Sequence, residues 1–359
     1  MTRFTFCGVL VSAVCFVAAN CLAEEPAAKP RAMVGAYYFD GWAGKHALAG
    51  NPNEPWAKDA PTHLTRRMLE EFPERTPIWG WRDDSLEVME KQIDLAADAG
   101  ISFFAFCWYW HPTKKEVAED SKHICLDLFL KAKNSSRMKF CLLVANHAPF
   151  LIGEKWDLAA EYWMPYLTHK QHVTVDGKPL LVLFNPRDSS KAGLETLQAA
   201  SKKAGLPGLT VAGCGGGDPK TGFTHKTFYN IVPGYAGGSQ EHKYAELVEA
   251  HQKQWSGSAT QPLIPEITAG WDKRPWEGPK GLNQKEGWYF PDRTPEAFAA
   301  YVSSAIEWMD KHPEQATKER MLLIYAWNEL GEGGFIAPTK GDPEGKYLKA
   351  MKGAIAPAR

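Results

Sequence analysis

Two acidic side chains and an amide follow an apolar run near the C-terminus. The run, residues 322–327, ends at Asn328 and Glu329, and Glu332 follows three residues later among glycines. Two carboxyl groups held together can hydrolyse an acetal, because one protonates the leaving oxygen while the other acts as a nucleophile or base. The glycines would let the backbone turn so that both acids face the same side. The pair therefore predicts a glycosidase centre, unless Glu332 only caps a loop or forms an ion pair.

Aromatic and polar side chains also follow most of the other apolar runs. Sugar-binding sites combine flat rings with a few amide, histidine or acidic groups. A ring at a strand end is common in cores, and a lone histidine such as His147 is often structural, but the recurrence at nearly every run favours a shared cleft. The residues that we expect to contact substrate are Tyr37, Tyr38, Trp108, Tyr109, His147, Tyr235, Trp271, Asp272, Trp327 and Asn328.

The apolar runs themselves predict the elements that hold these residues. Eight runs are continuously apolar, which is typical of parallel strands buried on both faces, and helical patterns follow most of them. The sequence predicts an α/β fold, a (β/α)8 TIM barrel forming a single domain over residues 33–359. An open, doubly wound sheet is the alternative, but no glycine-rich phosphate loop follows the first strand. The expected strands are residues 33–42, 101–110, 138–146, 179–185, 209–214, 228–235, 262–272 and 321–327. The expected helices are residues 84–99, 120–132, 158–168, 190–204, 242–255 and 295–311.

Three blocks of the sequence resemble the family 99 glycoside hydrolases and the related WbsX-like proteins. Residues 327–333, WNELGEG, are similar to the WNEWxEG signature, and residues 233–235 match a PGY element. Residues 270–275, GWDKRP, are similar to the GWDNTPR block of the WbsX-like branch. The resemblance implies a (β/α)8 barrel and a retaining, endo-acting α-mannosidase activity.

The same resemblance implies roles for individual residues. Glu332 would be the general acid/base. Glu329 would act on the sugar 2-hydroxyl, so that a 1,2-anhydro sugar forms in place of a covalent enzyme adduct. Tyr235 would lie beside the reacting sugar.

Departures from the family pattern leave the substrate open. Leu330 replaces the second tryptophan of the signature, and two long loops, residues 41–80 and 271–292, would reshape the cleft. We expect a retaining glycoside hydrolase that cleaves an α-linked polysaccharide, α-mannan-like or a related α-glycan. The alternatives are a noncatalytic carbohydrate-binding barrel and a WbsX-like glycosyltransferase or transglycosylase. The intact acids disfavour the first, and the lack of a nucleotide-binding motif disfavours the second.

The N-terminus has the pattern of a secretion signal. Residues 1–23 contain one arginine, an apolar stretch and small residues before a predicted cleavage point after Ala23. Residues 24–32 are then a linker, and we expect a periplasmic or extracellular protein. Lipidation at Cys21 is the alternative. No other stretch is apolar enough to span a membrane.

Composition narrows the expected partners. The formal net charge is −1 without long runs of one sign, which disfavours nucleic-acid binding and leaves a polysaccharide or oligosaccharide as the partner. Asp40, Asp272 and Asn185 are the only candidates for a shared cation, and their spacing matches no metal motif, so we expect no metal and no cofactor. Cysteines 107, 125, 141 and 214 are expected to be buried thiols, with one disulfide as the alternative.

Overall fold

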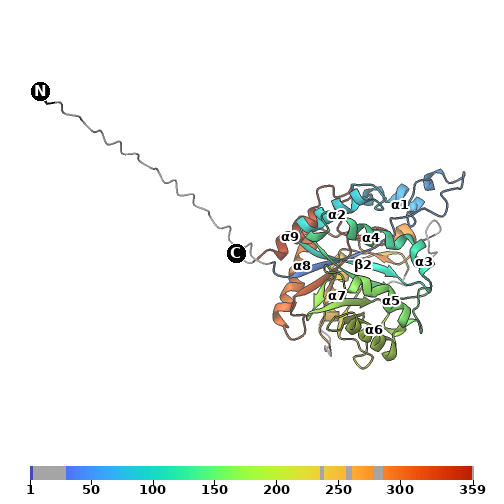
Figure 1. The fold of residues 1–359 in the computed structure, drawn as a ribbon. Coiled ribbons are helices and arrows are strands. Elements are labelled where there is room, and N and C mark those ends of the chain that lie inside the picture. Colours follow the sequence, from blue (N-terminus) through green and yellow to red (C-terminus); the bar gives the residue numbers. More distant parts are fainter. Residues whose placement is uncertain (3–29, 235–237, 256–260, 279–285, 358–359) are drawn as a thin grey trace.

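The fold is built on eight parallel strands that curl into a barrel (Figure 1). The structure is a computed structural model and describes residues 1–2, 30–234, 238–255, 261–278 and 286–357. Hydrogen bonding gives the strand order β7-β6-β5-β3-β2-β1-β11-β9, and the short β4 (Thr174–Val175) pairs antiparallel with β5. The parallel strands are β1 (Met33–Tyr38), β2 (Ile101–Tyr109), β3 (Lys139–Ala145), β5 (Lys178–Leu183), β6 (Thr210–Cys214), β7 (His225–Thr227), β9 (Glu266–Thr268) and β11 (Met321–Tyr325).

The two ends of this strand order meet, which nearly closes the barrel. Lys226 of β7 forms a parallel bridge with Leu263, just before β9. The Lys226 N–H donates to the Pro262 carbonyl, and the Ile264 N–H donates to the Lys226 carbonyl, each at 2.9 Å. The TIM-barrel-like α/β fold predicted from the sequence is therefore confirmed.

Helices surround the strands on the outside (Figure 1). The six predicted helices are confirmed as α2, α4, α5, α6, α7 and α8, whereas α1, α3 and α9 were not expected. Several begin at a side-chain cap, as where Ser85 accepts from the Val88 N–H at the start of α2. The helices are α1 (Arg66–Glu71), α2 (Leu86–Asp98), α3 (Lys114–Glu119), α4 (Ile124–Lys131), α5 (Trp156–Leu167), α6 (Lys191–Lys203), α7 (Tyr244–Trp255), α8 (Pro295–Lys311) and α9 (Lys346–Ile355).

The sixth strand lies earlier than predicted. It occupies His225–Thr227, and the described part of the apolar stretch assigned to it, residues 228–234, lies beyond the end of the strand. Pro233 has no N–H for a ladder, and Gly234 has φ +70°, so this stretch does not continue as a strand. Tyr229, Ile231 and Val232 of this stretch are half-buried against the core, and their apolar run looks like a strand in the sequence.

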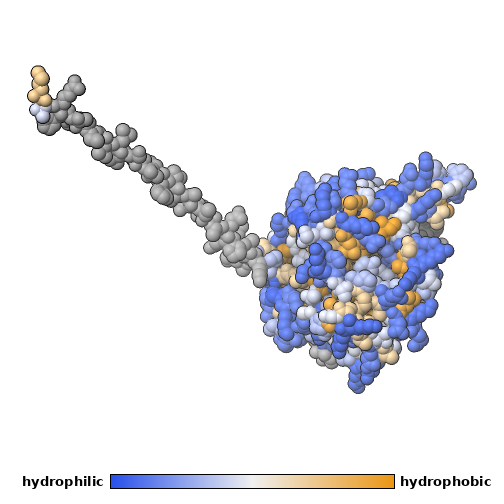
Figure 2. All heavy atoms as spheres, in the orientation of Figure 1, coloured by the Kyte–Doolittle hydropathy of each residue, from blue (hydrophilic) through white to orange (hydrophobic). Residues whose placement is uncertain are grey.

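The outer surface is mostly hydrophilic, with small apolar areas between the helices on the face seen in Figure 2. Within the described ranges, no helix is both long and apolar enough to cross a lipid bilayer. The predicted signal peptide and most of the linker lie outside the described residues. The four cysteines 107, 125, 141 and 214 are free thiols; three are buried as predicted, and Cys214 is half-buried.

Close packing between β1 and β2 gives a direct test of the barrel core. A Cβ on Gly35 would lie 2.1 Å from the ring of Phe103, so we expect Gly35→Ala to destabilise the protein by about 1–3 kcal/mol. A Cβ on Gly353 in α9 would have nothing within 4 Å, so Gly353→Ala should be neutral or slightly stabilising. Chemical denaturation of both variants would check this. Equal stabilities would contradict the close approach of Gly35 to Phe103.

Candidate active site

A short hairpin at the end of β11 carries the two glutamates. Its strands, β12 (Asn328–Glu329) and β13 (Gly334–Phe335), pair antiparallel across a tight turn. Gly333 takes φ +77°, and a Cβ on Gly334 would lie 2.1 Å from the Tyr325 ring. Glycine is therefore required at both positions for the hairpin to fold back onto the barrel mouth.

Glu329 is almost fully buried at this mouth, with 3% of its surface exposed. The Tyr229 hydroxyl donates to its Oε1, while Oε2 has no partner among the described residues. Burial, followed by the nearby charge of Glu332, raises the pKa of Glu329 well above its usual value; the Tyr229 hydrogen bond and the Lys273 charge oppose this shift. Its environment thus favours the protonated acid.

Glu332 has more polar surroundings than Glu329. The Tyr325 hydroxyl donates to its Oε2, and the Lys273 ammonium lies 2.8 Å from its Oε1. Its side chain is 14% exposed. The Asp272 N–H also donates to the Glu332 carbonyl at 2.7 Å, which fixes the backbone at this point. The two acids therefore differ in burial and in charge partner, which is how one fold holds paired carboxyl groups in different protonation states.

The two tyrosines that serve the acids pack against each other. Their ring centroids are 5.0 Å apart at an interplanar angle of 78°, and Tyr37 lies 5.0 Å from Tyr229 on the other side. Burial raises the pKa of both Tyr229 and Tyr325, so they remain hydroxyl donors at neutral pH. Sequence reasoning missed Tyr229, Tyr325 and Lys273. Of the three, Tyr325 was the easiest to predict from the sequence, because it ends the strand that leads to the glutamates.

Three of the predicted substrate contacts lie near this centre. Trp271 has its ring centroid 6.3 Å from Tyr325 and 5.7 Å from the Lys273 ammonium. Tyr109 lies 6.3 Å from His147, and burial, Cys107 and Glu329 raise the pKa of its hydroxyl. Burial lowers the pKa of His147, which favours the neutral imidazole. The structure thus groups these residues, and their role as substrate contacts stays a prediction.

The alternation of β2 separates two neighbours that the sequence grouped together. Cys107 and Tyr109 point into the barrel, where Cys107 Sγ lies 3.9 Å from the Tyr229 hydroxyl. Trp108, one residue out of phase, points toward the helices. It stacks on His123 at 4.7 Å and meets Trp163 of α5 edge-on. This placement argues against the substrate contact predicted for Trp108.

Four further candidates have their polar atoms bound within the protein. The Tyr37 hydroxyl donates to the Phe228 carbonyl at 2.7 Å, and the Tyr38 hydroxyl donates to Asp83 at 3.0 Å. Trp327 is buried and donates from Nε1 to Gln92 of α2 at 2.7 Å. These bonds explain why their rings are buried, and they indicate structural roles. Asn328 is the fourth.

The Asn328 side chain joins the hairpin to the end of β1. Its Oδ1 accepts from the Phe39 N–H at 2.7 Å, and its Nδ2 donates to the Phe39 carbonyl at 2.8 Å. The Asn328 carbonyl accepts from Trp42 Nε1 at 2.8 Å. With both ends of the amide engaged, Asn328 holds the hairpin that carries Glu329, and the substrate contact predicted for it is not supported.

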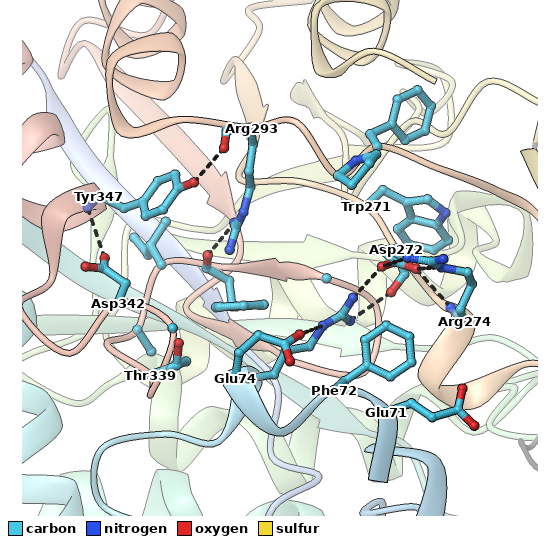
Figure 3. Close-up of a pocket in the computed structure, with 18 residues that line it drawn as sticks. Glu71, Phe72, Glu74, Trp271, Asp272, Arg274, Arg293, Thr339, Asp342 and Tyr347 are labelled. Carbon is cyan, nitrogen blue, oxygen red and sulfur yellow. Dashed lines mark hydrogen bonds and ion pairs between the residues drawn. The ribbon is translucent and has the colours of Figure 1, made fainter. Parts of the chain in front are cut away.

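Asp272 lies in an ionic cluster instead of facing the glutamates. Arg75 Nη2 lies 2.6 Å from its Oδ2, and Arg274 Nε lies 2.7 Å from its Oδ1. Hydrogen bonds from Arg274 and the two arginine charges lower the pKa of Asp272 against the opposing effect of its burial. Figure 3 shows these groups converging in a cavity of about 380 Å³ whose lining also includes Trp271 and Tyr347. The cluster ties the loop after β9 to the loop after α1.

Tyr235 and the possible cation site complete the residues predicted from the sequence. Tyr235 lies outside the described residues. The structure does not group Asp40, Asp272 and Asn185 as a cation site: Asp272 is bound by arginines, and Asn185 Oδ1 accepts from the Arg187 N–H at 3.3 Å. Asp40 lies in a different cluster.

Comparisons with known proteins agree with the barrel fold. The family model described as "Glycosyltransferase WbsX" matches residues 81–233 and 223–351, together more than half of the chain. A search of curated proteins found no match.

Solved structures that resemble the chain are distant in sequence. A "glycoside hydrolase-like protein" has a TM-score of 0.58 at 14% identity, covering 91% of this chain and 94% of its own. A GH99 endo-alpha-mannosidase from Bacteroides thetaiotaomicron has a TM-score of 0.54 at 15% identity, covering 89% of this chain and 95% of its own. At these identities the likeness establishes the fold.

The buried Glu329 predicts a pH-dependent stability. Because burial raises its pKa above the unfolded value, the folded state binds the extra proton between those two pKa values, and stability falls as pH rises through that window. Glu329→Gln keeps an acceptor for Tyr229 but cannot ionise. We expect its melting temperature to exceed that of the parent by roughly a few degrees at about pH 8, with the difference vanishing at about pH 4.

Glu332→Gln is the matched control for this measurement. It removes the ion pair with Lys273 and leaves that ammonium, whose side chain is 16% exposed, without its carboxylate. We expect this variant to be less stable than the parent at about pH 8. Equal effects of the two substitutions across the pH range would contradict the asymmetry of the pair.

Proposed function

The chain belongs to the family described as glycosyltransferase WbsX, and from this premise we propose that it is a retaining glycoside hydrolase. The proposed substrate is an α-linked polysaccharide, an α-mannan or a related α-glycan, attacked within the chain. The observation that carries the proposal is the pairing of Glu329 and Glu332 at the C-terminal end of the barrel, where enzymes of this fold keep their active sites. The distant likeness to a GH99 endo-alpha-mannosidase supports it.

The chemistry requires one acid and one base on either side of the anomeric carbon. In the proposed mechanism, Glu332 protonates the leaving oxygen, and Glu329 withdraws the proton of the 2-hydroxyl as that oxygen attacks the anomeric carbon. A 1,2-anhydro sugar results. Water, deprotonated by Glu332, then attacks the anomeric carbon, the bond between that carbon and the 2-oxygen breaks, and Glu329 returns its proton to the 2-oxygen, with net retention. Tyr229 and Tyr325 would orient the two carboxyl groups.

The resting charges favour the opposite starting state. The ion pair with Lys273 requires Glu332 to carry its charge, whereas burial favours a protonated Glu329. Substrate binding beside Lys273 must therefore be accompanied by transfer of one proton from Glu329 to Glu332. Otherwise, Glu329 is the acid and Glu332 is the base in this chain. A substrate with an activated leaving group distinguishes these two cases. Its leaving group needs no proton donor, so it restores activity only to the variant that lacks the acid.

Glycosyl transfer from a nucleotide sugar is the second candidate, favoured by the description of the family. The proposed export of the chain through residues 1–23 opposes it, because exported compartments lack nucleotide sugars. That segment lies outside the described residues, so export remains a proposal that N-terminal sequencing of the secreted protein would check.

Reducing-sugar release from a panel of α- and β-linked polysaccharides tests the hydrolase directly. We expect release from one α-glycan without any nucleotide sugar. Glu329→Gln and Glu332→Gln should each lower kcat by about 10²–10⁴-fold, because each removes one proton-transfer group. On a substrate with an activated aryl leaving group, only the variant that lacks the acid should recover its kcat.

Three outcomes would redirect the proposal. Activity that persists in both variants would remove the pair from the reaction. Release that depends on a nucleotide sugar would favour the transferase. Tight binding to one glycan without cleavage would favour a carbohydrate-binding barrel.

Lys273 gives a second test through the pH dependence of the reaction. Its positive charge lowers the pKa of Glu329, so Lys273→Met should raise that pKa further. Whichever limb of the pH profile Glu329 controls should then move to higher pH. Lys243→Met is the control, because Lys243 is 70% exposed and pairs with Asp292. A profile that moves equally in both variants, or in neither, would contradict an electrostatic role for Lys273.

A further inference from the structure

Two aspartates and a cysteine meet in the interior behind the glutamate hairpin. Asp40 follows β1, Asp83 precedes α2, and Cys125 lies in the first turn of α4. Their exposed fractions are 1%, 2% and 0%. One potential ligand atom from each residue lies within 4.8 Å of the other two. Three separate segments of the chain thus bring acidic and thiol groups to one buried point.

The hydrogen bonds around this cluster leave it short of positive charge. Asp40 Oδ2 accepts from the Cys125 N–H at 2.7 Å, but Asp40 Oδ1 is buried and has no partner. Asp83 accepts from the Tyr38 hydroxyl at 3.0 Å and from Cys125 Sγ at 3.3 Å. Among the residues that the structure describes, no lysine, arginine or histidine lies within ion-pair distance of either carboxyl group.

Such an arrangement is costly unless something neutralises it. A buried carboxylate without a counter-charge loses several kcal/mol of solvation, and two adjacent ones also repel each other. Either protons or a cation must compensate. The Oδ1 of Asp40, buried without a hydrogen-bond partner among the described residues, is the specific observation that points to a bound group.

We propose that Asp40, Asp83 and Cys125 bind one divalent transition-metal ion of the zinc, cobalt or iron class. The thiolate and one carboxylate balance the charge of such an ion while the second carboxyl group keeps a proton, and the cysteine sulfur disfavours magnesium and calcium, which take oxygen ligands. Binding would release the thiol proton that now faces Asp83, because the thiolate is the form that ligates. The three residues are almost fully buried, so the ion would enter during folding.

The proposed ion would be structural and not catalytic. Asp83 Oδ2 lies 3.5 Å from Asn328 Nδ2, and Asn328 precedes Glu329 in the hairpin. The ion would therefore link the end of β1, the entrance to α2 and the start of α4 to the strand that carries the glutamate. The site is independent of the proposed hydrolase activity, so either proposal can fail alone.

Metal analysis of the full-length protein, folded with Zn²⁺ or Co²⁺ and then freed of loose ions by a chelator, tests the site. We expect about one retained ion per chain and, with Co²⁺, a thiolate-to-metal charge-transfer absorption in the near ultraviolet. Cys125→Ser should abolish that absorption and weaken retention by about tenfold or more. Cys141→Ser is the control, because Cys141 is equally buried but belongs to no such cluster among the described residues, and it should behave like the parent.

X-ray absorption of the metal-loaded parent protein keeps the test decisive if Cys125→Ser does not fold. We expect one sulfur ligand among oxygen ligands. Failure to retain any of these ions would overturn the site and leave the two carboxyl groups sharing a proton. An ion bound through oxygen or nitrogen alone, or retained equally by Cys125→Ser, would overturn it as an adventitious ion elsewhere.

Discussion

The repulsion between two adjacent carboxyl groups is the constraint that shapes the mouth of this barrel. Glu329 and Glu332 lie on one tight hairpin, and each has its own tyrosine donor. Glu329 is almost fully buried without an ion-pair partner among the described residues, whereas Glu332 is paired with Lys273. Different surroundings thus distinguish the two acids, which is the physical requirement for acid and base catalysis by one pair.

Much of the scaffold was predictable because burial on both faces leaves a strong signal in the sequence. Seven strands and six helices follow from apolar runs and helical periodicity, since parallel strands must be apolar throughout. The prediction of the sixth strand was wrong for a related reason, because it also relied on an apolar run. Residues 228–234 form an apolar stretch that packs partly buried against the core outside the sheet, and composition alone does not distinguish such a loop from a strand.

The candidate site was only partly predictable, because direction matters as much as position. The glutamates follow from their place after the last strand. Trp108 and Tyr109 are adjacent and aromatic, yet one packs on His123 of the outer layer and the other faces His147 inside. Tyr229 and Lys273 reach the acids only through the fold, from segments about 100 and 60 residues away, so no local pattern could reveal them.

The Asn328 amide behaves as one extra rung of the β-sheet. It exchanges a donor and an acceptor with Phe39, as a backbone peptide would. Aspartate lacks the donor, and glutamine is one methylene too long for the same geometry. The amide in the WNE motif therefore reports that the hairpin is built, and it carries no information about whether the chain is an active enzyme. A relative that had lost both glutamates would still need the asparagine. A motif match at this position therefore identifies inactive relatives as readily as active enzymes.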